Sequence, residues 1–227
     1  MKLMYSGKTK DVFQNPSGTY TLKLKDDATG RDGVFDPGEN AVGLCIEGLG
    51  KESLKLTAYF FELLTENGIP HHFISHDVES ASMEVVPNKL FGEGLEFLCR
   101  LKADGSFIKR YGSYASFGSD LGCLVETTLK DDFRQDPPIT QDTLAVLGIM
   151  TPREYECCKE FTKKAAGIIA QDLKTKNLSL HDIKFEFGTK DDCVMLIDEI
   201  SAGCMRVYKD GKKVAPMDLG KLVLQSP

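Results

Sequence analysis

The sequence predicts an α+β protein with antiparallel sheets. Two pairs of strand-like segments are each joined by a short turn, which is typical of β-hairpins. The helix-like segments are grouped together and do not alternate with single strands, which argues against a parallel α/β sheet. The 227 residues suffice for one large domain or for two small lobes that share a core.

The N-terminal part predicts a hairpin, a loop and a helix. Residues 1–27 carry β-formers on both sides of the turn cluster NPSG, so they predict the first hairpin. Residues 28–50 are rich in glycine and predict a long irregular loop, which would serve as a lid. A stripe of apolar residues predicts a helix from about Glu52 to Asn67, with Gly68 as a stop signal.

The middle of the chain predicts further strands and then two helices. Residues 83–112 have a strand pattern, interrupted by NKLFGEG and ADGS. A short helix is expected after Thr140, and a long one after Thr151, where Pro152 and Glu154 complete a capping box. The buried face of the long helix is expected to carry Tyr155, Cys158, Phe161 or Thr162, Ala165, Ile168 or Ile169, and Leu173.

A second hairpin, DIKFEFG-TKDD-CVMLIDEIS, carries the most informative polar pattern. Strand alternation places three polar side chains on one face, namely Asp182, Lys184 and Glu186. A TKDD turn that pairs Phe187 with Cys193 would bring Glu186 and Asp198 onto one face as diagonal neighbours. A Mg²⁺ ion with nucleotide phosphates would relieve their repulsion. A solvated polar face explains the alternation equally well.

Two other segments are candidates for binding phosphate. In Ser6-Gly7-Lys8-Thr9-Lys10, two lysines two residues apart in a strand would point the same way, although exposed lysines alone explain such a string. Residues 97–112 form a basic island that contains Arg100, and Gly105-Ser106 could offer a backbone amide and a hydroxyl to a phosphate. A β-turn flanked by solvated charges is the alternative interpretation of the island.

Composition excludes several other classes of protein. Twenty-eight basic residues against thirty-four acidic ones give a net charge of −6, which disfavours nucleic acid as a partner. No apolar run approaches the length that crosses a bilayer, and the N-terminus lacks the apolar region of a signal peptide, so we expect a soluble cytoplasmic protein. The seven cysteines show no CxxC spacing and are expected to be reduced thiols.

Taken in order, the motifs resemble a known family. GKxK, LKDDATG, FELLxxxGIPHHFI, RxxxxGS, LKDD with DPPIT, DIKFEFG and IDEIS follow one another between about residue 5 and Arg206. This ordered set resembles the SAICAR synthetase family of purine biosynthesis. The resemblance implies an ATP-dependent carbon–nitrogen ligase that uses Mg²⁺ to join L-aspartate to the carboxylate of an aminoimidazole ribonucleotide, CAIR. The carboxylate would be activated as an acyl phosphate.

The resemblance also implies an architecture and a set of partners. The fold would be two-lobed, with ATP in the cleft between a β-rich nucleotide-clamping lobe (residues 1–80) and an α+β lobe with the metal and substrate site (residues 81–227). The partners would be the small molecules CAIR, L-aspartate and ATP, without nucleic acid or membrane. A homo-oligomer is compatible with the family, although no segment of the chain identifies an interface.

Roles for individual residues follow from the matching motif positions. The ATP side would comprise Lys8, Lys10 and Lys130, together with the Mg²⁺ ligands Glu186 and Asp198. The phosphate of CAIR would be bound by Arg100, Ser106 and Arg206. The junction where the substrates react would be lined by the two catalytic residues, Asp182 and Lys184.

The chain departs from the family pattern on the CAIR and aspartate side. The family's Pro-Asp pair is Ala202-Gly203 here, which removes a carboxylate, and Asp104 adds one within the AAGS-like loop. After Arg206, the usual Leu-Trp-Asp becomes Val207-Tyr208-Lys209. These departures keep open two alternatives: a ligase of the same fold with a different amine or carboxylate substrate, and an inactive nucleotide-binding paralogue.

Overall fold

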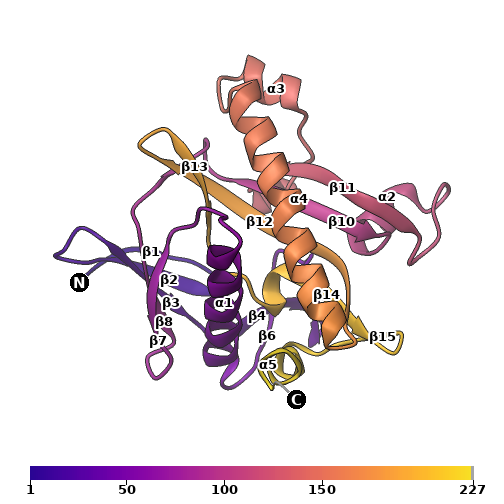
Figure 1. The fold of residues 1–227 in the computed structure, drawn as a ribbon, viewed down its shortest axis with the longest axis horizontal. Helices are drawn as coiled ribbons and strands as arrows, with labels where there is room; N and C mark the ends of the chain where they lie inside the picture. Colours follow the sequence, from indigo (N-terminus) through magenta and orange to yellow (C-terminus); the bar gives the residue numbers. More distant parts are fainter. Residues whose placement is uncertain (226–227) are drawn as a thin grey trace.

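The computed structural model describes residues 1–225 and confirms the α+β class (Figure 1). Its strands pair antiparallel in three sheets. Within the described residues, the α-helices are α1 (Leu49–Glu66), α2 (Gly105–Tyr111), α3 (Gln141–Val146), α4 (Pro152–Thr175) and α5 (Pro216–Leu224). None of the helices among these 225 residues is long and apolar enough to span a membrane.

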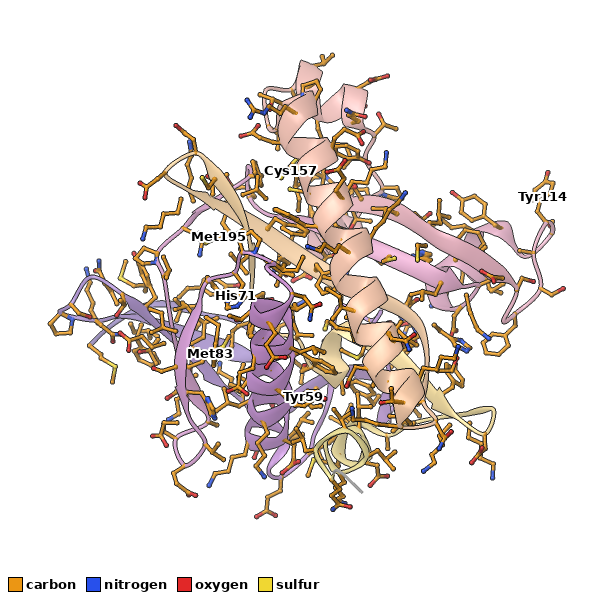
Figure 2. The ribbon with its side chains drawn as sticks, in the orientation of Figure 1. Tyr59, His71, Met83, Tyr114, Cys157 and Met195 are labelled. Atoms are coloured by element: carbon orange, nitrogen blue, oxygen red, sulfur yellow. The ribbon has the colours of Figure 1, made fainter. Side chains whose placement is uncertain are left out.

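The first sheet has five strands and packs against α1. Its order is β1 (Lys2–Ser6), β2 (Lys10–Gln14), β3 (Tyr20–Leu24), β8 (Ser82–Val85) and β7 (Phe73–Asp77). Phe60 and Phe61 of α1 are fully buried beside Leu22 and Met83 of the sheet. Figure 2 labels Met83 on the strand that passes beside α1. The boundary expected at residue 80 falls between β7 and β8, two neighbouring strands of this sheet.

The N-terminal segment forms two hairpins, although the sequence predicts one. Residues 7–9 turn the chain between β1 and β2, so Gly7 and Lys8 do not lie inside a strand. The turn is closed by a bond from the Gly7 N–H to the Lys10 carbonyl, 2.8 Å. Short polar residues around a glycine favour such a turn, and the alternation rule for strands does not apply across it.

The prediction of a long irregular loop for residues 28–50 is wrong. The segment forms a small sheet of order β5 (Val34–Phe35), β4 (Asp27–Arg31) and β6 (Val42–Cys45), and α1 begins at Leu49. The glycines allow close packing of these strands, because a Cβ added at Gly43 would lie 2.4 Å from the carbonyl of Gly30. The glycine content therefore reflects close backbone approach.

The third sheet has seven strands and lies under α4 (Figure 1). Its main path is β11 (Asp120–Leu129), β10 (Leu95–Lys102), β12 (Ser179–Lys190), β14 (Met205–Lys209) and β15 (Lys212–Lys213), while β13 (Cys193–Ile197) and β9 (Lys89–Leu90) pair with β12. The capping box at Thr151 is present, which confirms the predicted start of α4. Its predicted face is buried at Cys158, Thr162, Ala165, Ile169 and Leu173.

The predicted register of the second hairpin is wrong by three residues. Strand β12 continues to Lys190, so Phe187 pairs with Leu196 and not with Cys193. The turn consists of Asp191 and Asp192, which both have positive φ (50° and 59°). A two-residue hairpin turn requires this left-handed backbone, and aspartate tolerates it well.

The basic island also differs from its strand prediction. Residues 105–111 form helix α2, which directly follows the last residues of β10. Asp104 is the N-cap of this helix, and its carboxylate accepts a hydrogen bond from the Gly105 N–H. The ADGS string is therefore a helix start and not a β-turn.

Candidate active site

A cleft of about 470 Å³ lies where residues of all three sheets meet. One part of its lining is apolar, with Val12, Tyr20 and Leu22 from the first sheet, Phe35 from the small sheet and Ile197 from the third. The other part is charged and contains Lys8, Lys10, Lys130, Lys184, Glu96, Glu186, Asp198 and Glu199. A cleft with one apolar and one charged wall suits a ligand that has both a flat ring and phosphates.

Lysines pair with carboxylates in the charged part of the cleft. The Lys10 ammonium at the start of β2 contacts the carboxylates of both Asp198 and Glu199, which follow β13. The Lys130 Nζ lies 2.6 Å from a carboxylate oxygen of Glu186 on β12. The structure therefore brings together four of the residues predicted for the nucleotide side: Lys10, Lys130, Glu186 and Asp198.

Asp198 reaches the cleft by leaving the strand. The observed register places Ile197 opposite Glu186, and Asp198 itself has φ 69°, which is left-handed backbone. The His72 Nε2–H donates to the Asp198 carbonyl oxygen at 3.1 Å, and the His72 N–H bonds to the Leu196 carbonyl at 3.0 Å. His72 is 2% exposed and supports this bend. Its role was not apparent from the sequence.

The electrostatics of the cleft depend on burial and on these ion pairs. Burial and the neighbouring Asp198 raise the pKa of Glu186 to about 7. Burial would raise the pKa of Asp198 as well, but Lys10 and Lys130 hold it well below its usual range. Burial opposes the charge on Lys10, yet the carboxylates of Asp198 and Glu199 raise its pKa. The cleft thus concentrates opposite charges that a ligand can rearrange.

The carboxylates of the cleft are candidate ligands for a divalent cation. Glu186, Asp198 and Glu199 present oxygen donors to one cleft, and Mg²⁺ is commonly held by one or two carboxylates together with substrate phosphates. Within residues 1–225, no group of three or more His, Cys, Asp or Glu side chains is arranged to hold a metal ion.

Two further predicted residues line the cleft. The Lys184 Nζ lies 2.6 Å from Glu96, whose other carboxylate oxygen accepts from the Thr128 hydroxyl at 2.9 Å. Burial opposes the charge on Lys184, but Glu96 and Glu186 raise its pKa. Lys8 lies in the β1–β2 turn, 2.6 Å from Asp132. Glu96 was not predicted, because its partner is 88 residues away in the sequence.

The predicted anion-binding residues form a second cluster. The guanidinium of Arg100 on β10 contacts Glu126, donates to Asp182 at 3.2 Å and donates to the Ser106 hydroxyl at 2.8 Å. Arg206 on β14 donates to the same Asp182 at 2.9 Å. Asp182 thus joins Arg100, Ser106 and Arg206 in one group. Burial raises the pKa of Asp182, although both arginines oppose this.

Arg206 has a second acidic partner from the small sheet. Its Nη2 lies 2.8 Å from a carboxylate oxygen of Asp36, which follows β5. Gly38 lies against the same guanidinium, because a Cβ there would be 2.3 Å from Nη2. Asp36 was not predicted from the sequence, because it lies in the segment expected to be a loop.

The two clusters are separated along one strand. Asp182, Lys184 and Glu186 alternate on β12, and four residues of strand span roughly 13 Å. Lys184 and Glu186 line the cleft, whereas Arg100, Ser106, Arg206 and Asp182 do not. Gly203, where the resemblance leads us to expect a carboxylate, also lines the cleft, and a Cβ there would meet only the Ser201 hydroxyl, at 3.3 Å.

A cleft with an apolar wall and a wall of lysines and carboxylates, next to a cluster of arginines, is the class of site that suits a phosphate-bearing ligand with an apolar ring. Comparisons with known proteins identify one family. The sequence model of the family described as SAICAR synthetase matches residues 3–222. The chain therefore belongs to the SAICAR synthetase family, which confirms the resemblance.

Individual relatives agree with this assignment. A phosphoribosylaminoimidazole-succinocarboxamide synthase of Clostridium tetani is 54% identical over 227 residues, covering 99% of this chain and 100% of the relative. A solved SAICAR synthetase has a TM-score of 0.80 at 35% identity, covering 97% of this chain and 91% of that one. A SAICAR synthetase in complex with ADP has a TM-score of 0.81 at 29% identity, covering 92% and 86%.

Proposed function

We propose that this protein uses ATP to ligate L-aspartate to the carboxylate of CAIR, which gives SAICAR, ADP and phosphate. Membership of the SAICAR synthetase family supports this reaction. The observation that carries it is the cleft in which Lys10 and Lys130 meet Asp198 and Glu186. Charge neutralisation by lysines and a metal is what phosphoryl transfer requires.

ATP is proposed to bind in this cleft, between an N-terminal lobe (residues 1–80) and the rest of the chain. The apolar wall with Val12 and Leu22 suits the adenine ring. Lys8, Lys10 and Lys130 would contact the phosphates. Glu186 and Asp198 would hold Mg²⁺, which when bound neutralises charge on the transferred phosphoryl group. A SAICAR synthetase with this fold is described in complex with ADP, which supports ATP as the nucleotide.

CAIR is proposed to bind across β12, with its phosphate at the arginine cluster. Arg100 and Arg206 provide planar guanidinium groups that can bind a phosphate in a bidentate manner. The Ser106 hydroxyl accepts from Arg100, so its own proton can be donated to a phosphate. The roughly 13 Å between the clusters leaves room for a ribose and an imidazole, so that the CAIR carboxylate would lie near Lys184.

The chemistry proposed for these residues is positioning and charge stabilisation. A carboxylate oxygen of CAIR attacks the γ-phosphorus of ATP, ADP leaves, and an acyl phosphate forms. The uncharged amine of aspartate then attacks the acyl carbon, phosphate leaves with the bonding electrons, and the amine loses a proton. Lys184 would stabilise the anionic oxygens in both steps, and Asp182 would fix the arginines that orient CAIR.

The direct test is ADP release by the purified protein with MgATP and CAIR, with and without L-aspartate. SAICAR is followed by its absorbance in the same samples. Aspartate-dependent ADP release with an equal amount of SAICAR is the expected result. ATP consumption that requires CAIR but a different amine would replace aspartate as the substrate, with Gly203 as the first position to examine. MgATP binding without turnover of any substrate pair would identify an inactive paralogue.

A further inference from the structure

Asp104 is a buried carboxylate beside the arginine cluster. It is 7% exposed, and three donors point at its two oxygens. The Gly105 N–H donates to Oδ1 at 2.6 Å, whereas His181 Nδ1 at 3.0 Å and the Tyr208 hydroxyl at 2.9 Å both donate to Oδ2. A carboxylate with this many fixed donors holds its own chain segment rigidly.

Two different strands supply the side-chain donors. His181 lies in β12 at an irregularity of the β12–β14 pairing, where Leu180 pairs with Val207 and Asp182 pairs with Arg206. A bulge of this kind re-aims a side chain, and here the extra residue His181 turns to Asp104. The His181 and Tyr208 rings stack with centroids 3.9 Å apart and an interplanar angle of 17°. The stacking fixes both donors relative to each other.

The cluster of Asp104, His181 and Tyr208 is in contact with the arginine cluster. Gly105 has φ 49°, and a Cβ there would lie 2.6 Å from the guanidinium carbon of Arg206. Ser106, the next residue, accepts from Arg100. Arg206 and Tyr208 are two residues apart on β14, and His181 directly precedes Asp182. Any movement of Asp104 therefore moves the start of helix α2, at Gly105 and Ser106, against Arg206.

The charge of Asp104 is compensated locally. Burial would raise its pKa, but the hydrogen bonds from His181 and Tyr208 hold the pKa at about 2. Both carboxylate oxygens are hydrogen-bonded: Oδ1 to the Gly105 N–H, and Oδ2 to His181 and Tyr208. Asp104 and Tyr208 are both positions at which the chain departs from the family pattern, and the structure joins them by a hydrogen bond.

We propose that Asp104, His181 and Tyr208 form a positioning cluster that fixes the start of helix α2, at Gly105 and Ser106, and Arg206 for a phosphate monoester. The cluster itself does not touch the reacting atoms. The proposal that the phosphate belongs to CAIR rests on the function proposed above, whereas the positioning of a phosphate site does not.

The test compares Asp104→Ala with Asp104→Asn. Asp104→Ala removes all three acceptor contacts, and we expect the KM for CAIR to rise about tenfold while kcat and the KM for ATP stay within about twofold. Asp104→Asn keeps the side-chain shape and one acceptor oxygen, which can still accept from the Gly105 N–H while the new amide NH2 donates to the Tyr208 oxygen, so the KM should lie within about threefold of the wild-type value. Asp120→Ala is the control, because Asp120 accepts the Gly122 N–H at an exposed site.

A second measurement is independent of the proposed reaction. Binding of ribose 5-phosphate, measured by calorimetry, should weaken about tenfold in Asp104→Ala and stay unchanged in Asp120→Ala. If the wild-type protein does not turn over CAIR, the proposed function fails and this binding measurement alone decides the positioning role. Unchanged binding in Asp104→Ala, or equal increases in KM for CAIR and ATP, would overturn it.

Tyr208→Phe removes the hydroxyl that donates to Asp104 and keeps the ring. This variant therefore tests the positioning role if Asp104→Ala does not fold. It should raise the KM for CAIR or the Kd of ribose 5-phosphate about threefold. In the double variant with Asp104→Ala, the effect of Tyr208→Phe should vanish, because the two side chains act through one contact. If the increases in KM or Kd from the two single variants added fully in the double variant, a shared positioning role would be contradicted.

Discussion

The two ends of the polar face of β12 differ in how their charges are paired. At the Glu186 end, lysines and carboxylates line an open cleft. At the Asp182 end, Arg100 is 1% exposed and already bonded to Glu126, Asp182 and Ser106. A ligand can enter the cleft by exchanging partners with lysines, whose charge lies at the end of a flexible chain, whereas a phosphate at the arginines must replace or join carboxylates that are already bonded there.

The Glu186 end and the Asp182 end of β12 are therefore suited to different roles. The cleft end is suited to groups that change charge during a reaction, because lysine side chains adjust easily. The arginine end is suited to holding an unreactive group in place, because planar guanidiniums with fixed partners lose little freedom on binding. Variants at each end should therefore affect different kinetic constants.

The largest effect is expected at the cleft end. Glu186→Gln keeps the shape but removes a negative charge from the proposed metal site, so kcat with saturating substrates should fall by about 10³-fold. Steady-state ADP release measures this. Glu160→Gln, on the exposed side of α4, is the matched control and should behave as wild type. A normal rate in Glu186→Gln would remove the metal role from this residue.

The next effect separates the arginine end from the cleft. Arg100→Lys keeps the charge but loses the planar fork, so the KM for CAIR should rise about 30-fold with the KM for ATP nearly unchanged. Arg110→Lys is the control, because Arg110 also contacts Glu126, at 2.6 Å, but lies at the edge of the cluster. Equal changes for the two substrates would show that the two ends do not act separately.

Lys8→Ala is the converse experiment at the cleft. Lys8 is partly exposed and paired with Asp132, so its loss should raise the KM for MgATP about fivefold and leave that for CAIR unchanged. Lys51→Ala, which removes a lysine paired with Glu79 at the surface, is the control. A larger change for CAIR than for MgATP would place Lys8 on the other substrate.

The smallest effect tests the competition at Arg206. Asp36→Asn weakens the ion pair at 2.8 Å, so a phosphate should bind more easily and the KM for CAIR should fall about twofold. Glu39→Gln changes the charge of the same loop, where Glu39 pairs with Arg31 and Lys109, so it should leave the KM for CAIR unchanged. An increase in KM for Asp36→Asn would mean that Asp36 orients Arg206 for the ligand.

Local sequence patterns were sufficient to predict the helices whose ends and buried faces depend on nearby residues alone. The capping box at Thr151 and Pro152 sets the start of α4, and the apolar spacing sets its buried face. The N-cap at Thr140 is likewise confirmed. Short-range hydrogen bonds and helical periodicity decide these features, so neighbours in the sequence contain the information.

Local sequence patterns were not sufficient to predict which strands pair and in which register. The small sheet of residues 27–45 was missed because glycines that allow close strand contact look the same as loop glycines. The hairpin register was missed because TKDD contains two adjacent turn candidates, and only the positive φ values of Asp191 and Asp192 select the shorter turn. In both cases the decisive energy lies in contacts between strands.

The sequence by itself determined the α+β class, the long helix and the family, and through the family the residues expected at the site. Tertiary structure alone decided how those residues meet. Lys10 contacts Asp198 across 188 positions of the chain, and Asp198 reaches the cleft only through a left-handed bend supported by His72. Such contacts depend on how whole sheets pack, and packing is a property of the folded core that no local pattern records.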